Sequence, residues 1–475
     1  MLFNSIQFLI FFITVVTAFY LTPFKWRWLL LLVASCYFYM AYIPVYILIL
    51  AFTITIDYFV GIYLERTKGR VKKLLLIVSI LSNIGILGFY KYYNFIAGII
   101  SALLGHVGYR SNIPFSHFIL PIGLSFHTFQ ALSYIIEVYR GNQKAEKHFG
   151  IYALYVMFFP QMVAGPIERP QNIIYQFYER RKFDAGNVSS GLTLMLRGFF
   201  KKLVVADRIA IYVNVVYKDP VGSDGKTILV ATILFAFQIY CDFSGYSDIA
   251  IGAARVLGFK LVTNFNRPYL ARNVSEFWKR WHISLTTWFR DYLYIPMGGN
   301  KVKLPMVYFN LFFVFTVSGL WHGASWNFVI WGALNGFYLI FLKLTKKFWP
   351  VFFRITYLDK LPWLKISLQI IVTTSFITIS WVFFRANNLS DALIILKKIV
   401  AFNGVVMRAE YQLFYCFIGI LILLIYEVKT EYFNRKFSLF NSSNIFIRNL
   451  SLVLVVITIV LLGVFDGGQF IYFQF

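Results

Sequence analysis

The chain has 475 residues, of which 59% are hydrophobic and 14% charged, with a formal net charge of +25. This composition excludes an ordinary soluble enzyme and is typical of a polytopic membrane protein. The basic residues form short clusters between apolar runs, such as Arg66–Lys73, Lys201–Lys202 and Lys343–Lys347. Such clusters are typical of cytoplasmic loops and of contacts with anionic lipid headgroups. We therefore expect an all-α chain whose partner is a lipid bilayer and not nucleic acid.

Apolar stretches alternate with short polar segments along the chain. One span needs about 20 apolar residues, and on this measure we predict about 11 transmembrane helices plus re-entrant or interfacial helices. The first apolar stretch, Ser5 to Phe24, precedes Lys25 and Arg27. This order predicts a retained first span with its N-terminus outside. The sequence shows no repeat and no long linker, so we predict one membrane domain over residues 1–475.

The three cysteines, Cys36, Cys241 and Cys416, are far apart and lie in apolar sequence. They match neither a disulfide framework nor a metal site. The sequence has no H-E-x-x-H motif, so we predict no bound metal and no bound cofactor.

Two carboxylates, Asp242 and Asp248, lie within the apolar run from Gln238 to Gly252. Carboxylates at such depth are costly unless they are paired or face water. We predict that Asp242 pairs with Arg255 or Arg267, and this structural pairing is favoured over a catalytic role.

Aromatic and charged residues crowd into the run from Trp278 to Asn300. Helical spacing places His282 on one face with the side chains of Trp278, Trp281, Leu285, Trp288 and Tyr292, while Lys279, Arg280 and Arg290 leave that face. Asn273 and Glu276 have the spacing of a capping box, and Pro296 with the glycines after it ends the helix. We predict one amphipathic helix at the membrane interface or beside a wet cavity.

The stretch from Leu304 to Leu342 contains no Asp, Glu, Lys or Arg, and its single histidine is His322. It can cross a bilayer once with a re-entrant piece, or nearly twice. Gly319 and Gly323 would allow a close approach to the imidazole, with the Trp321 indole on one side. A histidine in this setting is either a packed helix contact or a reactive base.

An imidazole can take the proton from a hydroxyl that attacks a thioester, or can carry the acyl group itself. The sequence shows no G-x-S-x-G elbow, no Walker loop and no dinucleotide fingerprint. The residues alone therefore predict a membrane protein with a candidate buried histidine site.

Two segments resemble the membrane-bound O-acyltransferase family, and within it the bacterial branch of alginate and peptidoglycan O-acetyltransferases. They are NFNRPYLARNVSEFWKRWHISLTTWFRDYLYIPMGGN, Asn264 to Asn300, and SGLWHGASWNFVIWGALNG, Ser318 to Gly336. The segment CDFSGYSD and the closing FIYFQF are further specific parts. The resemblance covers most of the chain and implies a catalytic core at about residues 117–385.

The resemblance implies helices around a central funnel or tunnel, with His322 as the catalytic base or acyl relay and His282 as a second functional residue. It implies that Arg280 and Arg290 lie at a phosphate-rich mouth. The residues expected along the substrate tunnel are Trp281, Trp321, Asp291, Asp242, Tyr246, Arg280 and Asn327.

The same resemblance implies a location in the bacterial inner membrane and a thioester donor that enters from the cytoplasm, either acetyl-CoA or an acyl carrier protein. It also implies a separate extracytoplasmic partner, an SGNH-like acetyltransferase, that modifies the polysaccharide.

Two other functions stay open. One is the D-alanyl transfer of teichoic acid synthesis, against which the Gly298–Asn300 segment favours acetyl transfer. The other is a non-catalytic polysaccharide export subunit, since a wet tunnel lined by aspartates and arginines would also serve a permeant.

Overall fold

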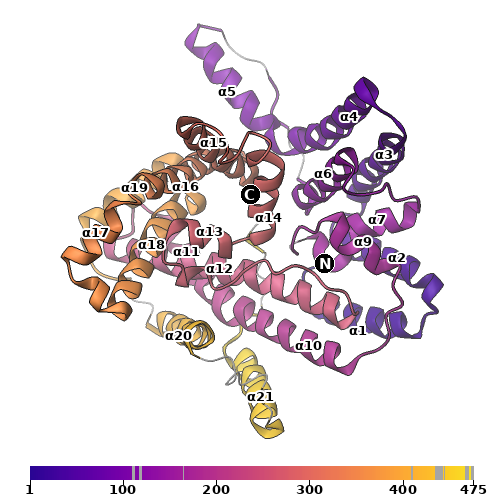
Figure 1. Cartoon of the computed structure of the whole chain (residues 1–475). Helices are drawn as coiled ribbons and strands as arrows, with labels where there is room; N and C mark the ends of the chain where they lie inside the picture. The colour runs from indigo at the N-terminus through magenta and orange to yellow at the C-terminus, as the bar shows by residue number, and fades with distance from the viewer. Residues whose placement is uncertain are drawn as a thin grey trace. The chain divides into compact units, whose positions relative to one another are not determined.

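The computed structural model describes residues 1–109, 113–116, 120–163, 165–407, 410–433, 442, 444–465 and 470–471. Every regular element in these ranges is a helix (Figure 1). This confirms the predicted all-α class. Of the FIYFQF segment, Phe470 and Ile471 are described, and residues 472–475 lie outside the described ranges.

Within the described residues, eight helices are long and apolar enough to cross a membrane. The predicted number of about 11 is not confirmed. Helix α1 (Ile6–Leu21), which Ser5 caps, is apolar but shorter than these eight. The apolar sequence after His148 is divided into α7 (Phe149–Met157) and α8 (Phe159–Met162), because the chain turns at Phe158 ahead of Pro160. The eight candidates are Pro44–Arg66, Gly69–His106, Gly225–Val256, Leu304–His322, Trp326–Leu344, Pro362–Arg385, Tyr411–Tyr432 and Ile445–Leu462.

The chain forms two compact units, and the first comprises Met1–Met195 and Asp248–Val262. Its core is a bundle in which α3, α4 and α6 pack on one another. In this bundle Asp57 accepts hydrogen bonds from Ser79 and Asn83, at 2.5 and 2.9 Å. Helices that belong wholly to this unit, besides α1, α7 and α8, are α2 (Arg27–Met40), α3 (Ile47–Arg66), α4 (Gly69–Leu87), α5 (Tyr93–His106), α6 (Leu124–Arg140) and α9 (Pro170–Phe177).

The second unit comprises Leu196–Ser247 and Thr263–Phe475. Two helices, α10 (Ala185–Phe199) and α12 (Gly225–Val256), contribute residues to both units. The other helices of the second unit are α11 (Asp207–Lys218), α13 (Val274–Arg280), α14 (Ile283–Phe289), α15 (Leu304–His322), α16 (Trp326–Leu344), α17 (Phe348–Ile355), α18 (Pro362–Arg385), α19 (Leu389–Ala401), α20 (Glu410–Tyr432) and α21 (Ile445–Leu462).

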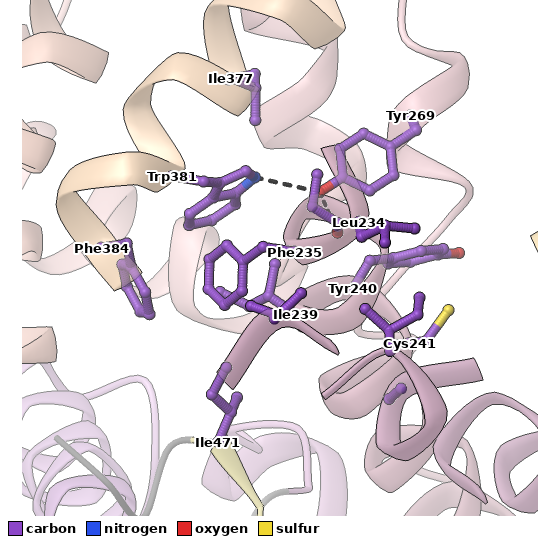
Figure 2. Packing of buried hydrophobic residues seen from close by; sticks show 14 of the residues in the cluster. Leu234, Phe235, Ile239, Tyr240, Cys241, Tyr269, Ile377, Trp381, Phe384 and Ile471 are labelled. Carbon is purple, nitrogen blue, oxygen red and sulfur yellow. Dashed lines mark hydrogen bonds between the residues drawn. The ribbon is translucent and has the colours of Figure 1, made fainter. Parts of the chain in front are cut away.

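The core of the second unit draws on many helices, and α12 and α18 both contribute large aromatic rings to it. Figure 2 shows Trp381 and Phe384 of α18 beside Phe235 and Ile239 of α12. The Trp381 indole donates a hydrogen bond to the Tyr269 hydroxyl at 3.2 Å, which in turn donates to the Ala236 carbonyl at 2.7 Å. Each polar atom of these rings thus has a partner inside the protein, as burial requires.

A buried ion-pair cluster replaces the pairing that we predicted for Asp242. The Nζ atom of Lys202 lies 2.6 Å from Asp242 and 2.8 Å from Asp207, and all three side chains are buried. Asp242 also accepts a hydrogen bond from the backbone N–H of Ile471 at 2.7 Å. Arg267, one of the two predicted partners, instead pairs with Glu431. The prediction was wrong because Lys202 belongs to the core and not to an exposed basic cluster.

Replacing Lys202 should destabilise the protein strongly. Lys202→Met would leave two buried carboxylates without their cation, and we expect it to lower the free energy of unfolding by about 3–5 kcal/mol. Thermal unfolding in detergent would measure the loss. Lys218→Met changes an exposed lysine and provides the control. Equal stability of the two variants would contradict the importance of the cluster.

Candidate active site

His322 lies at the corner of a helical hairpin. It is the last residue of α15, and α16 begins four residues later at Trp326. The two helices pack side by side along their lengths (Figure 1). The stretch from Leu304 to Leu342 therefore forms two helices, each long and apolar enough to cross a membrane. The turn between them places the imidazole at one end of both helices.

Glycines allow the two helices to approach each other closely. A Cβ atom added at Gly319 would collide with the Phe328 carbonyl oxygen and would lie 3.0 Å from the Cα of Gly332. A Cβ at Gly323 would meet the Phe328 ring. We predicted that these glycines would let backbone or a substrate approach the imidazole closely. The structure shows a close approach of the α16 backbone at Gly319 and of the Phe328 ring at Gly323, and the approach of a substrate stays a prediction.

Aromatic rings surround His322, which is 8% exposed. Its ring stands edge-on to Trp331 at 5.1 Å and to Phe384 at 5.5 Å between centroids. These rings continue into the core of Figure 2. The indole whose contact with His322 the structure describes is thus Trp331 of α16. The predicted neighbour, Trp321, is half-buried near the end of α15.

The predicted helix through His282 is broken in two. Asn273 caps α13 as expected, accepting a hydrogen bond from the Glu276 N–H at 2.9 Å. The helix ends at Arg280, and His282 adopts a left-handed backbone with φ 41° and ψ 54°. Tertiary contacts cause the break, because Ile283 donates its N–H to the carbonyl of Asn264 instead of to a helical carbonyl.

His282 is buried, 3% exposed, beneath aromatic rings. The Phe243 ring meets the imidazole edge-on at 4.6 Å, and Asn264 Oδ1 lies 3.1 Å from Nδ1. Burial, and then the charge of a protonated His322, lower the pKa of His282 well below its ordinary value of 6.5. The neutral imidazole is therefore the form present at pH 7, as a general base requires.

One cavity of about 910 Å³ reaches both histidines. It follows α15 from Leu311 to His322, a length of about 17 Å at the helical rise of 1.5 Å per residue. Apolar side chains form much of its surface, including Leu311, Val314, Phe315, Leu339, Val372 and Phe376. The site can thus enclose a long, thin, mostly apolar group next to two imidazoles.

Cations lie along the same cavity, and two of them are far from His322. Lys343 is near the C-terminal end of α16, where its Nζ lies 3.0 Å from the Oδ1 of Asn300, and Lys346 follows it. Because α15 and α16 are antiparallel, this end lies opposite the His322 corner. The other cationic lining residues are Arg272, Lys279 and Arg290. The far end therefore suits an anionic group such as a phosphate.

Of the predicted tunnel residues, Trp281 lines this cavity. The other six lie outside its lining in the described part of the chain. Arg280 pairs with Glu276 and Glu431, at 2.6 and 2.8 Å, and Asp291 accepts a hydrogen bond from Arg290 at 2.7 Å.

The remaining four of these six residues also lie elsewhere in the structure. Asp242 belongs to the Lys202 cluster, and Tyr246 packs on Phe470 with ring centroids 4.5 Å apart. Asn327 donates a hydrogen bond to the Ala386 carbonyl at 2.9 Å, and Trp321 lies in the last turn of α15. Their roles in a substrate path stay predictions.

Sequence reasoning missed several residues that the structure brings to the site. Lys343 and Lys346 were interpreted as headgroup contacts, and their cluster gave no sign of a cavity. Trp331 was seen only as part of an apolar span. Asn264 opens the first resembling segment, which was the one available signal, but an Asn in a loop has many uses.

Comparison with known proteins identifies the family. The description "MBOAT, membrane-bound O-acyltransferase family" matches residues 147–386. The chain belongs to this family. It is 36% identical over 409 residues to the peptidoglycan O-acetyltransferase of Helicobacter pylori, covering 80% of this chain and 74% of that one. It is also 36% identical over 395 residues to the probable alginate O-acetylase AlgI of Pseudomonas aeruginosa, covering 82% and 73%.

A teichoic acid D-alanyltransferase of Streptococcus thermophilus is more distant. It is 31% identical over 232 residues, which cover 46% of this chain and 56% of that protein. The chain is thus a multi-pass membrane acyltransferase. This finding sets aside the alternative of a non-catalytic export subunit.

Adding a single methyl group at the hairpin should disturb the site. Gly319→Ala would push its Cβ into the backbone of α16, and we expect the two helices to separate and His322 to move. The expected result is an acyl-transfer rate at least about 10² lower, measured at equal protein level. Gly85→Ala, where a Cβ meets nothing within 4 Å, is the control. A Gly319→Ala variant as active as this control would refute the argument.

Proposed function

We propose that this protein transfers an acetyl group from a cytoplasmic thioester towards an extracytoplasmic polysaccharide, with His322 as the general base or acyl relay. The single observation that carries the proposal is the cavity that both His282 and His322 line. Both imidazoles are buried, and apolar side chains form much of the cavity lining beside them, which disfavours water around a bound thioester.

The shape and charge of the cavity support a pantetheine thioester as the donor. Such donors carry the acyl group at the end of a long, narrow arm that has phosphate at its base. The cationic end at Lys343 and Lys346 suits the phosphate, and the apolar length along α15 suits the arm. The acyl group would then lie beside His322. Acetyl-CoA and an acyl carrier protein both have this chemistry, and both are substrates rather than bound cofactors.

The proposed reaction requires a general base and a site from which water is largely excluded. The imidazole of His322 takes the proton of the attacking hydroxyl, a new C–O bond forms, and the C–S bond of the thioester breaks. The proton then passes from the imidazolium to the leaving thiolate, so the histidine is regenerated. His282, neutral at pH 7, is the second base in the same cavity.

The relatives support acetyl transfer over D-alanyl transfer. Proteins named peptidoglycan O-acetyltransferase and alginate O-acetylase match about four fifths of the chain, whereas the D-alanyltransferase matches less than half. We infer a location in the bacterial inner membrane and an extracytoplasmic, SGNH-like acetyltransferase as the partner that completes the transfer. The acceptor would be alginate, another exopolysaccharide or peptidoglycan.

Removing the His322 imidazole should abolish acetylation. We expect His322→Ala to lower the rate of polymer O-acetylation by about 10²–10⁴, because general-base catalysis is lost, and His282→Ala to cause a partial or complete loss. Acetyl content of the extracellular polymer, at matched protein levels, is the measurement. His106→Ala, on the exposed end of α5, is the control. Normal acetylation in the His322→Ala strain would remove this residue from the mechanism.

Neutralising the cationic end should weaken donor binding. The double variant Lys343→Ala/Lys346→Ala would lose charge-assisted hydrogen bonds to phosphate, and we expect the KM for acetyl-CoA to rise about tenfold or more with kcat changed less. Lys347→Ala removes an exposed neighbouring lysine that does not line the cavity and serves as the control. Equal KM values for the two variants would place the phosphate elsewhere.

A further inference from the structure

Asn264 forms hydrogen bonds with three consecutive residues, His282, Ile283 and Ser284. Its backbone carbonyl accepts the N–H of Ile283 at 2.9 Å. Its side-chain Oδ1 lies 3.1 Å from Nδ1 of His282, and it accepts hydrogen bonds from the N–H and hydroxyl of Ser284 at 3.3 and 2.9 Å. Asn264 itself is fully buried. These bonds span the point at which His282 takes its left-handed backbone, a conformation that is costly without such support.

The hydrogen bonds determine which way the Asn264 amide is turned. A backbone N–H can only donate, so the atom that faces the Ser284 N–H must be the amide oxygen. The amide nitrogen points the other way and donates to the Ser247 hydroxyl of α12 at 3.2 Å. The oxygen that faces His282 is an acceptor, and Nδ1 must therefore carry the hydrogen.

We propose that Asn264 is a positioning residue that fixes His282 in the neutral tautomer with hydrogen on Nδ1, so that Nε2 is the basic nitrogen. This inference rests on the proposed function, in which His282 is the second base. Asn264 does not line the cavity among the described residues, and it acts on the reaction through the imidazole. Ser247 in turn fixes the orientation of the Asn264 amide.

The surroundings of His282 make an amide suitable at this position. The charged groups on the neighbouring elements already have partners. Asp242 is paired with Lys202. Arg280 is paired with Glu276 and with Glu431. Arg290 is paired with Asp291, and His322 acts on His282 by its charge. A neutral acceptor orients the ring without favouring the imidazolium. A carboxylate in its place would favour the protonated form and raise the pKa of His282.

Nitrogen NMR of the full chain in lipid nanodiscs tests the tautomer directly. The chain has six histidines, so ¹⁵N-histidine labelling gives few signals, and a His282→Gln spectrum assigns those of His282. We expect protonated Nδ1 and unprotonated Nε2 at pH 7 in the native protein. In Asn264→Leu this preference should be lost, while Ser247→Ala should weaken it. Hydrogen on Nε2 in the native protein, or an unchanged tautomer in Asn264→Leu, would overturn the proposal.

Asn264→Asp provides a second test that keeps the oxygen acceptor facing His282 and Ser284, while the Ser247 hydroxyl would have to donate where it now accepts. We expect the pKa of His282 to rise by about 1–3 units, so that the acid limb of the kcat/KM profile moves to higher pH by the same amount. Asn214→Asp adds a carboxylate beside Arg385, outside the cavity lining, and should leave the profile in place. An Asn264→Asp profile that coincides with this control would overturn the proposal.

Different results would contradict the proposed role of His282 and the proposed role of Asn264. If His282→Gln transfers acetyl groups at the native rate, the role of His282 in the proposed function is wrong, whatever the tautomer. If His282→Gln is inactive but Asn264→Leu and Asn264→Asp have the native kcat and pH profile, only the role of Asn264 is wrong. The NMR measurement needs no donor or acceptor and decides the tautomer independently of the assay.

Discussion

Buried polar groups in this protein have to find their partners within the protein, because a lipid bilayer offers none. This constraint explains the most unusual contacts of the second unit. Lys202 is fully buried between two carboxylates, and Asp242 accepts a further hydrogen bond from the backbone N–H of Ile471. The Asn264 amide joins Ser247 to the segment that contains His282. Each of these polar groups contacts a residue distant in sequence, and together these contacts position the segment that contains His282.

In the hairpin of α15 and α16, the same constraint is met by the backbone hydrogen bonds within each helix. Both helices satisfy their own peptide groups, so they can lie in lipid and still approach closely at glycines. The sharp corner at His322 brings a polar ring to the end of two apolar helices, where Trp331 and Phe384 enclose it. The imidazole is thus buried by aromatic rings and still lines the cavity. A thioester arm placed along α15 would end beside this ring.

The two histidines differ in the way they are positioned. His322 ends a regular helix, and packing against aromatic rings orients it. His282 lies at a break between two short helices with a left-handed backbone, and hydrogen bonds to one asparagine orient it. Aromatic packing therefore positions one imidazole, and hydrogen bonding to a neutral amide positions the other.

The sequence by itself determined the class, because apolar stretches of span length and a scarcity of charge leave no other environment for the chain. It also determined the Asn273 cap and the position of His322 in an apolar stretch of span length, since both depend on neighbouring residues. The tertiary structure alone decided the break at His282, the partner of Asp242 and the cavity that unites the two histidines. Each of these depends on contacts such as Asn264 with Ile283, or Lys202 with Asp242, between residues that local periodicity cannot relate. Helical spacing of apolar residues predicts one continuous helix for as long as the spacing continues. The position at which the helix ends is set by long-range hydrogen bonds, such as that from Ile283 to Asn264, which the spacing does not reveal.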